Sequence, residues 1–331
     1  MKVGKLSSAE LRAQVLPYRG SSRPDVLLGP GVGLDSAVID LGGDVCVISS
    51  DPITGAGQGA GRLAVTVATN DVAAHGAQPV GVQVVLLLPE QAAPGALAGI
   101  MQEIDAEARR LGVAVLGGHT EITSRVQDTV IVVTAVGRAP RDQWVSAAGA
   151  RPGDAMVVTK GVGLEGTAIL ATDFRDELAA ALGEELVARA AAFGRELSVV
   201  EDALTAAGAG ARAMHDVTEG GLLGAVEEMC EAAGVGCELW TDRVPVRAET
   251  EVICAHLGLD PLGLLSSGSL LIAAPDGEAV VEALERKSIV AACIGRFTAS
   301  DAGRRMRDRT GEWRQLAVYP RDELWRFLEG R

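Results

Sequence analysis

Five carboxylates in loop-like settings are the residues of this chain that could do chemistry. Each lies beside glycines or follows an apolar run that is typical of a strand. Mg²⁺ prefers oxygen ligands, and in enzymes it is usually held by one or two carboxylates together with substrate phosphates. Any one of the five alone is better explained as solvated surface, but the set of five favours a multi-metal phosphate site. The five are Asp35, Asp51, Asp71, Glu121 and Asp216.

The stretch 29–55 supplies the first two carboxylates. Glycines stand on alternate positions at 29, 31 and 33, and Asp35 follows them. Glycine lets the backbone approach a ligand closely. The apolar run 45–48 predicts a short buried strand that delivers Asp51 into a turn. A hairpin flanked by two acidic turns is the alternative that this stretch leaves open.

The elements that follow place the third and fourth carboxylates. Apolar residues at helical spacing predict a helix over 62–77, with Asn70 and Asp71 on one side and His75 one turn further. A short strand over 113–116 is expected to end in the glycine turn that holds Gly118, His119 and Glu121. Further expected elements are strands over 80–88 and 129–136 and a helix over 94–111.

The second half places Asp216 in an acidic turn before a helix over 222–233. Its Pro- and Gly-rich start, residues 137–154, predicts a domain boundary. Strands are expected over 155–159, 235–240, 269–274 and 289–294, helices up to about residue 208, and an amphipathic helix at the C-terminus. Both halves mix strands with helices, so the predicted fold class is α/β (α+β) with two domains.

Four common site types are disfavoured. The chain has no GxxxxGK[ST] sequence, which excludes a P-loop. Gly161, Gly163 and Gly166 match GxGxxG, but the helical segment 173–197 follows where a dinucleotide site needs a second strand. A phosphate loop at a helix N-terminus survives this objection. The histidines at 75, 119 and 215 lie on three separate segments, which disfavours zinc, and no G-x-S-x-G elbow occurs.

Composition narrows the class of protein. The formal net charge of −14 argues against binding to nucleic acids or to anionic membranes. The five cysteines form no CxxC pair, and we expect reduced thiols in a cytoplasmic protein. The first residues lack a hydrophobic signal region, and no apolar run is long enough to span a bilayer.

Six segments in order resemble a known superfamily. It comprises aminoimidazole ribonucleotide synthetase, selenophosphate synthetase, thiamine-monophosphate kinase and the hydrogenase maturation factor HypE, and is called PurM-like. The similar segments are GLDSAVI at 33–39, SD at 50–51, NDVAAHGAQP at 70–79, GGHT at 117–120, HDVTEGGL at 215–222 and SSGSLLI at 266–272. The last of these is similar to a HypE strand, and the overall pattern lies nearest to HypE.

This resemblance implies an enzyme that depends on ATP and Mg²⁺. Residues 1–148 would form an N-terminal domain that binds ATP and Mg²⁺ and pairs into a dimeric β-barrel, and residues 149–331 a C-terminal domain. By resemblance the metal ligands would be Asp35, Asp51, Asp71 and Asp216, and the nucleotide contacts would add Asn70, Gly118, His119 and Gly163. The expected catalytic residues are Asp71, His119 and Asp216.

Departures from the family pattern leave the acceptor of the phosphate open. HypE ends in a cysteine that is carbamoylated and dehydrated, whereas this sequence ends in Arg331, and no cysteine precedes Cys46. We therefore expect a separate small molecule, or a residue of another protein, as the acceptor. The alternatives are a kinase or synthetase relative acting on a small phosphorylated substrate, and a nucleotide-binding assembly protein with little turnover.

Overall fold

The structure is a computed structural model that describes residues 8–54, 59–308 and 310–330. The chain divides into two compact units. The N-terminal unit holds Ser22–Gly29 and Asp35–Trp144, and the C-terminal unit holds Met1–Ser21, Pro30–Leu34 and Val145–Arg331. The domain limits at 148 and 149 stay a prediction. The α/β class with a sheet in each unit is confirmed.

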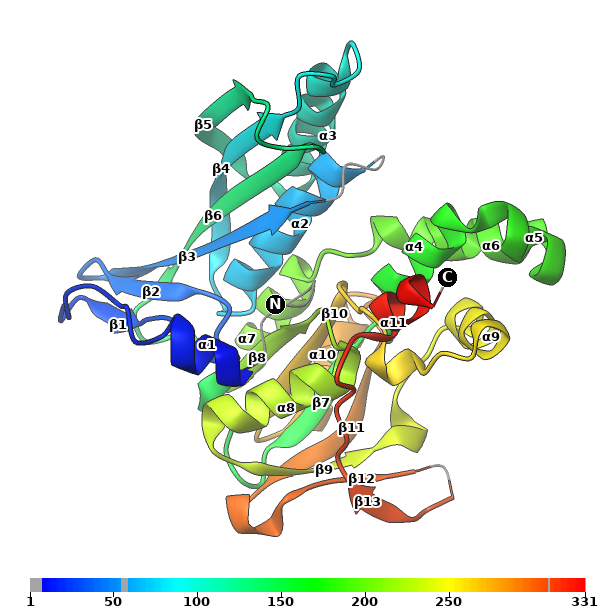
Figure 1. Cartoon of the computed structure of the whole chain (residues 1–331). Helices are drawn as coiled ribbons and strands as arrows, with labels where there is room; N and C mark the ends of the chain where they lie inside the picture. Colours follow the sequence, from blue (N-terminus) through cyan, green and yellow to red (C-terminus); the bar gives the residue numbers. More distant parts are fainter. Residues whose placement is uncertain (1–7, 55–58, 309, 331) are drawn as a thin grey trace. The chain divides into compact units, whose positions relative to one another are not determined.

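The N-terminal unit is a six-stranded sheet with two helices packed on one face (Figure 1). Its strand order is β1-β2-β3-β6-β4-β5, and β4 and β5 are its parallel pair. The elements are β1 (Val26–Leu28), β2 (Ala37–Asp40), β3 (Asp44–Ile53), α2 (Ala60–Ala73), β4 (Gln78–Leu88), α3 (Ala96–Leu111), β5 (Ala114–Ile122) and β6 (Val130–Pro140).

Small side chains let the two helices approach each other and the sheet. Burial alternates along β3 and β6, so every second residue of these strands packs under α2. A Cβ on Gly61 would lie 2.6 Å from the Ile100 carbonyl oxygen of α3, which leaves room only for glycine. Gly112 ends α3 in the left-handed conformation, as the sequence predicts.

The strands run further than expected, and this corrects the setting of four candidate residues. Asp51 lies inside β3, where it is opposite Val133 of β6, and not in a turn. Gly118 and His119 lie inside β5, opposite Val84 and Val85 of β4, and the carboxylate Glu121 lies inside β5 as well. The partner strands β6 and β4 continue past the apolar runs of β3 and β5. Hydrogen bonds to these partners extend β3 and β5, and a local sequence pattern cannot predict such an extension.

The C-terminal unit has a seven-stranded sheet ordered β13-β12-β9-β11-β7-β10-β8. Asp216 lies in the edge strand β8 and not in a turn, which is a further correction. The strands are β7 (Ala155–Thr159), β8 (Ala213–Val217), β9 (Gly236–Trp240), β10 (Ser269–Ala274), β11 (Ala291–Thr298), β12 (Arg304–Arg307) and β13 (Trp313–Gln315). The helices are α1 (Ser8–Gln14), α4 (Leu164–Asp173), α5 (Arg175–Leu182), α6 (Glu184–Ala192), α7 (Val200–Gly208), α8 (Gly221–Ala233), α9 (Ala248–Leu257), α10 (Gly277–Glu285) and α11 (Glu323–Glu329).

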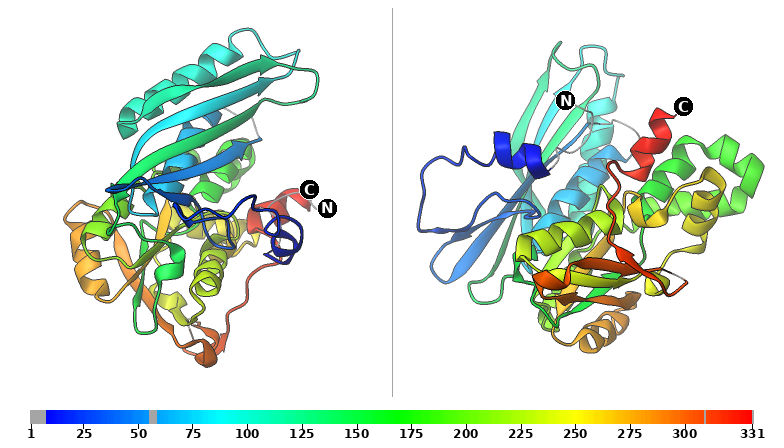
Figure 2. Two further views of the ribbon diagram at one scale, coloured as in Figure 1. Left: turned by 90° about the vertical axis from the view of Figure 1, so that its left-hand side faces the viewer. Right: turned by 60° about the horizontal axis from the view of Figure 1, so that its bottom comes forward.

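Helices cover both faces of this second sheet (Figure 2). Met156 and Val158 of β7 share a core with α8. Val157 between them points to the opposite face, where a Cβ on Gly277 of α10 would lie 3.4 Å from its Cγ2. In the described parts of the chain, none of the helices has the length and apolarity needed to cross a membrane.

The sheet of the N-terminal unit keeps an apolar face that α2 and α3 do not cover. Its outward residues are only half-buried, and all nine residues of the edge strand β5 are exposed. An uncovered apolar sheet face of this kind is typical of an interface, and so is a long unpaired edge strand. The outward apolar residues include Ile48, Val85, Leu87, Val130, Val132 and Val136.

We expect the chain to form a homodimer through this face. Val132→Glu places a charge at the middle of the face, on β6, and should convert the dimer into a monomer because an unpaired charge is costly to bury. Light scattering at micromolar concentration measures the mass. Leu41→Glu, on an exposed turn of the same unit, is the matched control and should remain dimeric. A wild-type protein that is monomeric under these conditions would rule the prediction out.

Candidate functional site

Ser49 joins two of the predicted metal ligands inside the N-terminal unit. Its hydroxyl group contacts the Asp71 carboxylate, with 2.6 Å between Oγ and Oδ2, and the main-chain oxygen of Asp35, at 2.9 Å. Asp71 is a buried residue of α2, and a buried carboxylate requires hydrogen-bond partners. Three segments therefore meet at Ser49: the residues before β2, the middle of β3 and the C-terminal turn of α2. We call this place the Ser49 junction.

Asp51 lies two residues beyond Ser49 on the same, helix-facing side of β3. One carboxylate oxygen of Asp51, Oδ2, is buried and has no hydrogen-bond partner among the described residues. A buried carboxylate oxygen in that state is costly unless something absent from the chain itself, such as a cation, binds it. The donor set of Asp35, Asp51 and Asp71 is all oxygen, which fits Mg²⁺.

The end of α2 is held by its own residues. Asn70 is fully buried, and its main-chain oxygen accepts the amide of Ala74 at 2.8 Å. The Nδ1 atom of His75 lies 3.0 Å from the main-chain oxygen of Asp71, so the ring caps the helix end that carries the carboxylate. This contact gives His75 a structural role.

Gly118 and His119 are not brought to the Ser49 junction. Two strands, β6 and β4, separate β5 from β3, which corresponds to about 14 Å at ordinary strand spacing. The His119 side chain is exposed, with its Nε2 3.8 Å from a carboxylate oxygen of Glu121. Gly118 has a structural reason to be glycine, because its φ is +146° and a Cβ there would lie 1.7 Å from the Val84 carbonyl oxygen.

In the C-terminal unit, three loops meet at one end of the sheet. Strands β7 and β8 are each antiparallel to β10 between them, so β7 and β8 are parallel. The loops after β7 and β8 therefore lie at the same end of the sheet as the loop before β10. Asp216 is a buried residue of β8 opposite Leu270, and the neighbouring His215 has its Nε2 2.9 Å from a Glu228 carboxylate oxygen.

The glycine segment 161–166 uses most of its amides inside the protein. The amide of Gly163 donates to Ser266 Oγ at 2.8 Å, and the amide of Gly166 donates to the Leu265 main-chain oxygen at 2.8 Å. The Ser269 hydroxyl group donates to the Gly161 main-chain oxygen at 2.5 Å. The segment is thus bound to the loop before β10, and phosphate binding by the Gly163 amide would require breaking its bond to Ser266.

Two buried acids near these loops were not singled out from the sequence. Burial raises the pKa of Glu165 to about 7, although a hydrogen bond with Ser267 opposes this rise. Burial also raises the pKa of Asp322 to about 6, against the lowering effect of three main-chain amides. An aspartate directly before a helix is typical of an N-cap, and Asp322 is the N-cap of α11. No local sequence pattern indicates the long-range contacts of Asp322.

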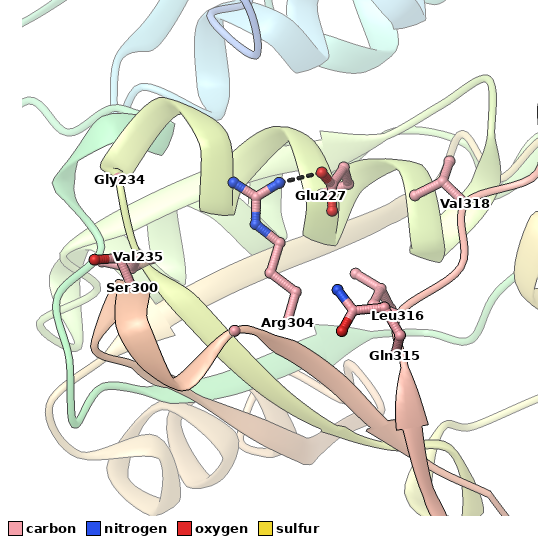
Figure 3. A pocket seen from close by; sticks show the side chains of 9 residues that line it. Glu227, Gly234, Val235, Ser300, Arg304, Gln315, Leu316 and Val318 are labelled. Carbon is pink, nitrogen blue, oxygen red and sulfur yellow. Dashed lines mark hydrogen bonds and ion pairs between the residues drawn. The ribbon is translucent and has the colours of Figure 1, made fainter.

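A hollow of about 570 Å³ lies elsewhere in the C-terminal unit (Figure 3). Arg304 and Glu227 form an ion pair across it, and Gln315 and Leu316 line another side. None of the residues that line this hollow belongs to the predicted site.

Comparisons with known proteins agree with the six segments. Two family models match the chain. The model of the AIR synthase related protein, N-terminal domain, matches residues 33–139, and the model of the AIR synthase related protein, C-terminal domain, matches residues 151–307. The carbamoyl dehydratase HypE of Rhodobacter capsulatus is 33% identical over 283 residues, which cover 83% of this chain and 81% of the relative.

Solved structures share the fold. One of the hydrogenase maturation protein HypE in complex with ATP has a TM-score of 0.74 at 24% identity and covers 97% of both chains. A ThiL structure complexed with AMPPCP and TMP has a TM-score of 0.70 at 20% identity, and covers 88% of this chain and 91% of its own. The chain therefore belongs to the AIR synthase related family, and its resemblance to the HypE proteins of that family is confirmed.

Proposed function

We propose that this protein is an ATP- and Mg²⁺-dependent enzyme that uses the ATP phosphate to activate an acceptor. The observation that carries the proposal is the Ser49 junction. There Oδ2 of Asp51, which has no hydrogen-bond partner among the described residues, lies on the same strand face as the serine that holds Asp71. The family membership and the ATP complex of a HypE structure support the choice of nucleotide.

Each residue of the junction has a separate task in this proposal. Asp35, Asp51 and Asp71 would hold Mg²⁺, which supplies positive charge against the phosphates when it is bound. Ser49 fixes the rotamer of Asp71 through the 2.6 Å bond. Asn70 would contribute to the nucleotide pocket from the same helix. In the C-terminal unit, Asp216 is proposed as a further metal ligand and Gly163 as a nucleotide contact.

His119 and Gly118 keep a proposed role at the nucleotide. His119 is exposed on an edge strand, so a ligand or a second copy of the chain can reach it. For Gly118 the close approach of Val84 already explains the residue type.

The proposal is tested by calorimetry with ATP in the presence of Mg²⁺ and in the presence of EDTA. Binding should require the metal, because acidic loops repel a bare triphosphate. Phosphate release is then measured with candidate acceptors, both small molecules and proteins. Equal ATP affinity in Mg²⁺ and in EDTA would overturn the proposal, and tight binding without turnover would favour a nucleotide-binding assembly protein.

The second candidate is a kinase-type transfer to a small phosphorylated substrate. It is favoured by the likeness to the ThiL structure with AMPPCP and TMP, which concerns the fold alone at 20% identity. Transfer of labelled phosphate from ATP to a small molecule, with no protein acceptor present, would select this candidate.

We expect none of the five cysteines of this chain to become carbamoylated or converted to a thiocyanate. Cys230, Cys237 and Cys254 are buried, and Cys46 and Cys293 are half-buried residues of strands, so none can leave the fold to enter a catalytic site. The test is peptide mass spectrometry after incubation with ATP, Mg²⁺ and a carbamoyl-transferring protein. A thiocyanate mass on any of the five would contradict this expectation.

A further inference from the structure

Asp322 accepts three main-chain hydrogen bonds from three separate segments of the C-terminal unit. Its Oδ1 accepts the amide of Leu324, at 2.8 Å, and the amide of Leu265, at 3.2 Å, and its Oδ2 accepts the amide of Gly220, at 2.7 Å. The first bond caps α11, and the other two reach across 57 and 102 residues of sequence. The residue is 2% exposed, so water does not compete for these bonds.

Gly220 and Leu265, the two distant hydrogen-bond partners of Asp322, belong to the loops that meet at one end of the sheet. Gly220 precedes α8 and follows Asp216 by four residues, and it has a φ of +91°. Leu265 precedes Ser266, whose amide donates to the Thr218 main-chain oxygen at 3.3 Å. The loop after β8 is thus held at two points, by Asp322 and by Ser266, and Asp322 also holds the segment that contains Ser266.

Glycine needs such external support here. Gly220 and Gly221 both have positive φ, and glycines lose the most conformational freedom on folding. Gly220 has no side chain that could restrain its backbone. The Asp322 carboxylate restrains it instead, by accepting a charge-assisted hydrogen bond from the Gly220 amide, and such bonds are the stronger class.

We infer that Asp322 is a positioning residue, which fixes the loop 218–221 and through it the candidate ligand Asp216. This inference rests on the proposed function, since it assigns Asp322 to the nucleotide site through Asp216. Asp322 does not itself touch nucleotide or metal in this role. Its ionised form matches the task, because a carboxylate offers acceptor positions on both oxygens whereas an amide has one accepting atom.

Three variants separate positioning from simple stability. Asp322→Asn keeps the size but turns one acceptor into a donor, which must face an amide proton. Asp322→Ser keeps an N-cap for α11 and removes the reach to Leu265 and Gly220. The matched control is Glu323→Gln, because Glu323 is equally buried in the next position and accepts the amide of Asp260, at 2.9 Å. Among the described residues, Glu323 forms no hydrogen bond with Gly220 or Leu265.

The measurements are hydrogen exchange of the peptide amides in 218–221 and calorimetry with Mg-ATP, at a temperature where circular dichroism shows each variant folded. Both Asp322 variants should exchange faster in 218–221 and bind Mg-ATP about 10-fold more weakly, as expected for the loss of one bond to a charged group. Glu323→Gln should match the wild type in both.

Two outcomes overturn the inference. Unchanged exchange in 218–221 would show that Asp322 does not hold this loop, and equal effects in Glu323→Gln would reduce its role to anchoring α11. Failure of the proposed function looks different, because then the wild-type protein itself would show no Mg²⁺-dependent binding of ATP. The exchange result would still decide whether Asp322 positions the loop.

Discussion

Asp71→Asn should leave the fold intact and weaken Mg-ATP binding by about 3 kcal/mol, or ~100-fold, the size of a lost contact to a charged ligand. The substituted amide keeps one oxygen that can accept the Ser49 hydroxyl group, now at 2.6 Å from Asp71, so the local packing is retained. What is lost is the charge, because an amide oxygen is a weaker ligand for Mg²⁺ than a carboxylate. Calorimetry with ATP and Mg²⁺ measures the change.

The control for this variant is Asp128→Asn. Asp128 is an exposed residue of the same unit, in the loop before β6, so the variant removes the same charge without touching the Ser49 junction. Its ATP affinity should stay within twofold of the wild type. Equal weakening in both variants would show that the acidic unit acts only through its overall charge, and an unchanged affinity in Asp71→Asn would remove the residue from the site.

The sequence predicts those parts of the fold that local patterns determine. The pattern over 94–111 and the glycine after it predicted α3 with its Gly112 cap, and the apolar runs predicted the cores of β4 and β6. It could not predict β12, β13 or the full length of β5. β12 and β5 depend on the distant partner strands β9 and β4, and β13 is a three-residue strand with every residue exposed. β5 has no buried residue to produce a pattern.

The candidate site divides in the same way. Asp35 and Asp51 could be chosen from the sequence because carboxylates beside glycines and strand ends are a chemical signal, and Asp71 because it follows Asn70 on one side of a predicted helix. Ser49 and Asp322 could not, since their importance lies in which distant atoms they contact. A serine within a strand and an aspartate before a helix are common, and only the fold identifies their partners.

The buried acid Glu165 leads to the second large prediction, which concerns stability and pH. Its pKa is raised from 4.5 to about 7, chiefly by burial and further by the nearby Asp322 carboxylate, while the Ser267 bond lowers it. Between these two pH values the folded protein binds a proton that the unfolded chain has released. The contribution of Glu165 to stability is therefore fully present below pH 4.5 and is lost as the pH rises through 7.

Glu165→Gln should abolish this dependence, because glutamine can bond to Ser267 without carrying a charge. Each pKa unit corresponds to about 1.4 kcal/mol. As the pH rises from acidic to mildly alkaline, the free energy of unfolding of the variant should therefore increase by about 3 kcal/mol relative to that of the wild type. Urea unfolding at pH values on either side of the range measures the difference. Glu278→Gln, an exposed acid in the first turn of α10, is the matched control and should show no such gain. If the stability difference between Glu165→Gln and the wild type is independent of pH, the carboxyl group of Glu165 does not titrate differently in the folded and unfolded states, and the prediction fails.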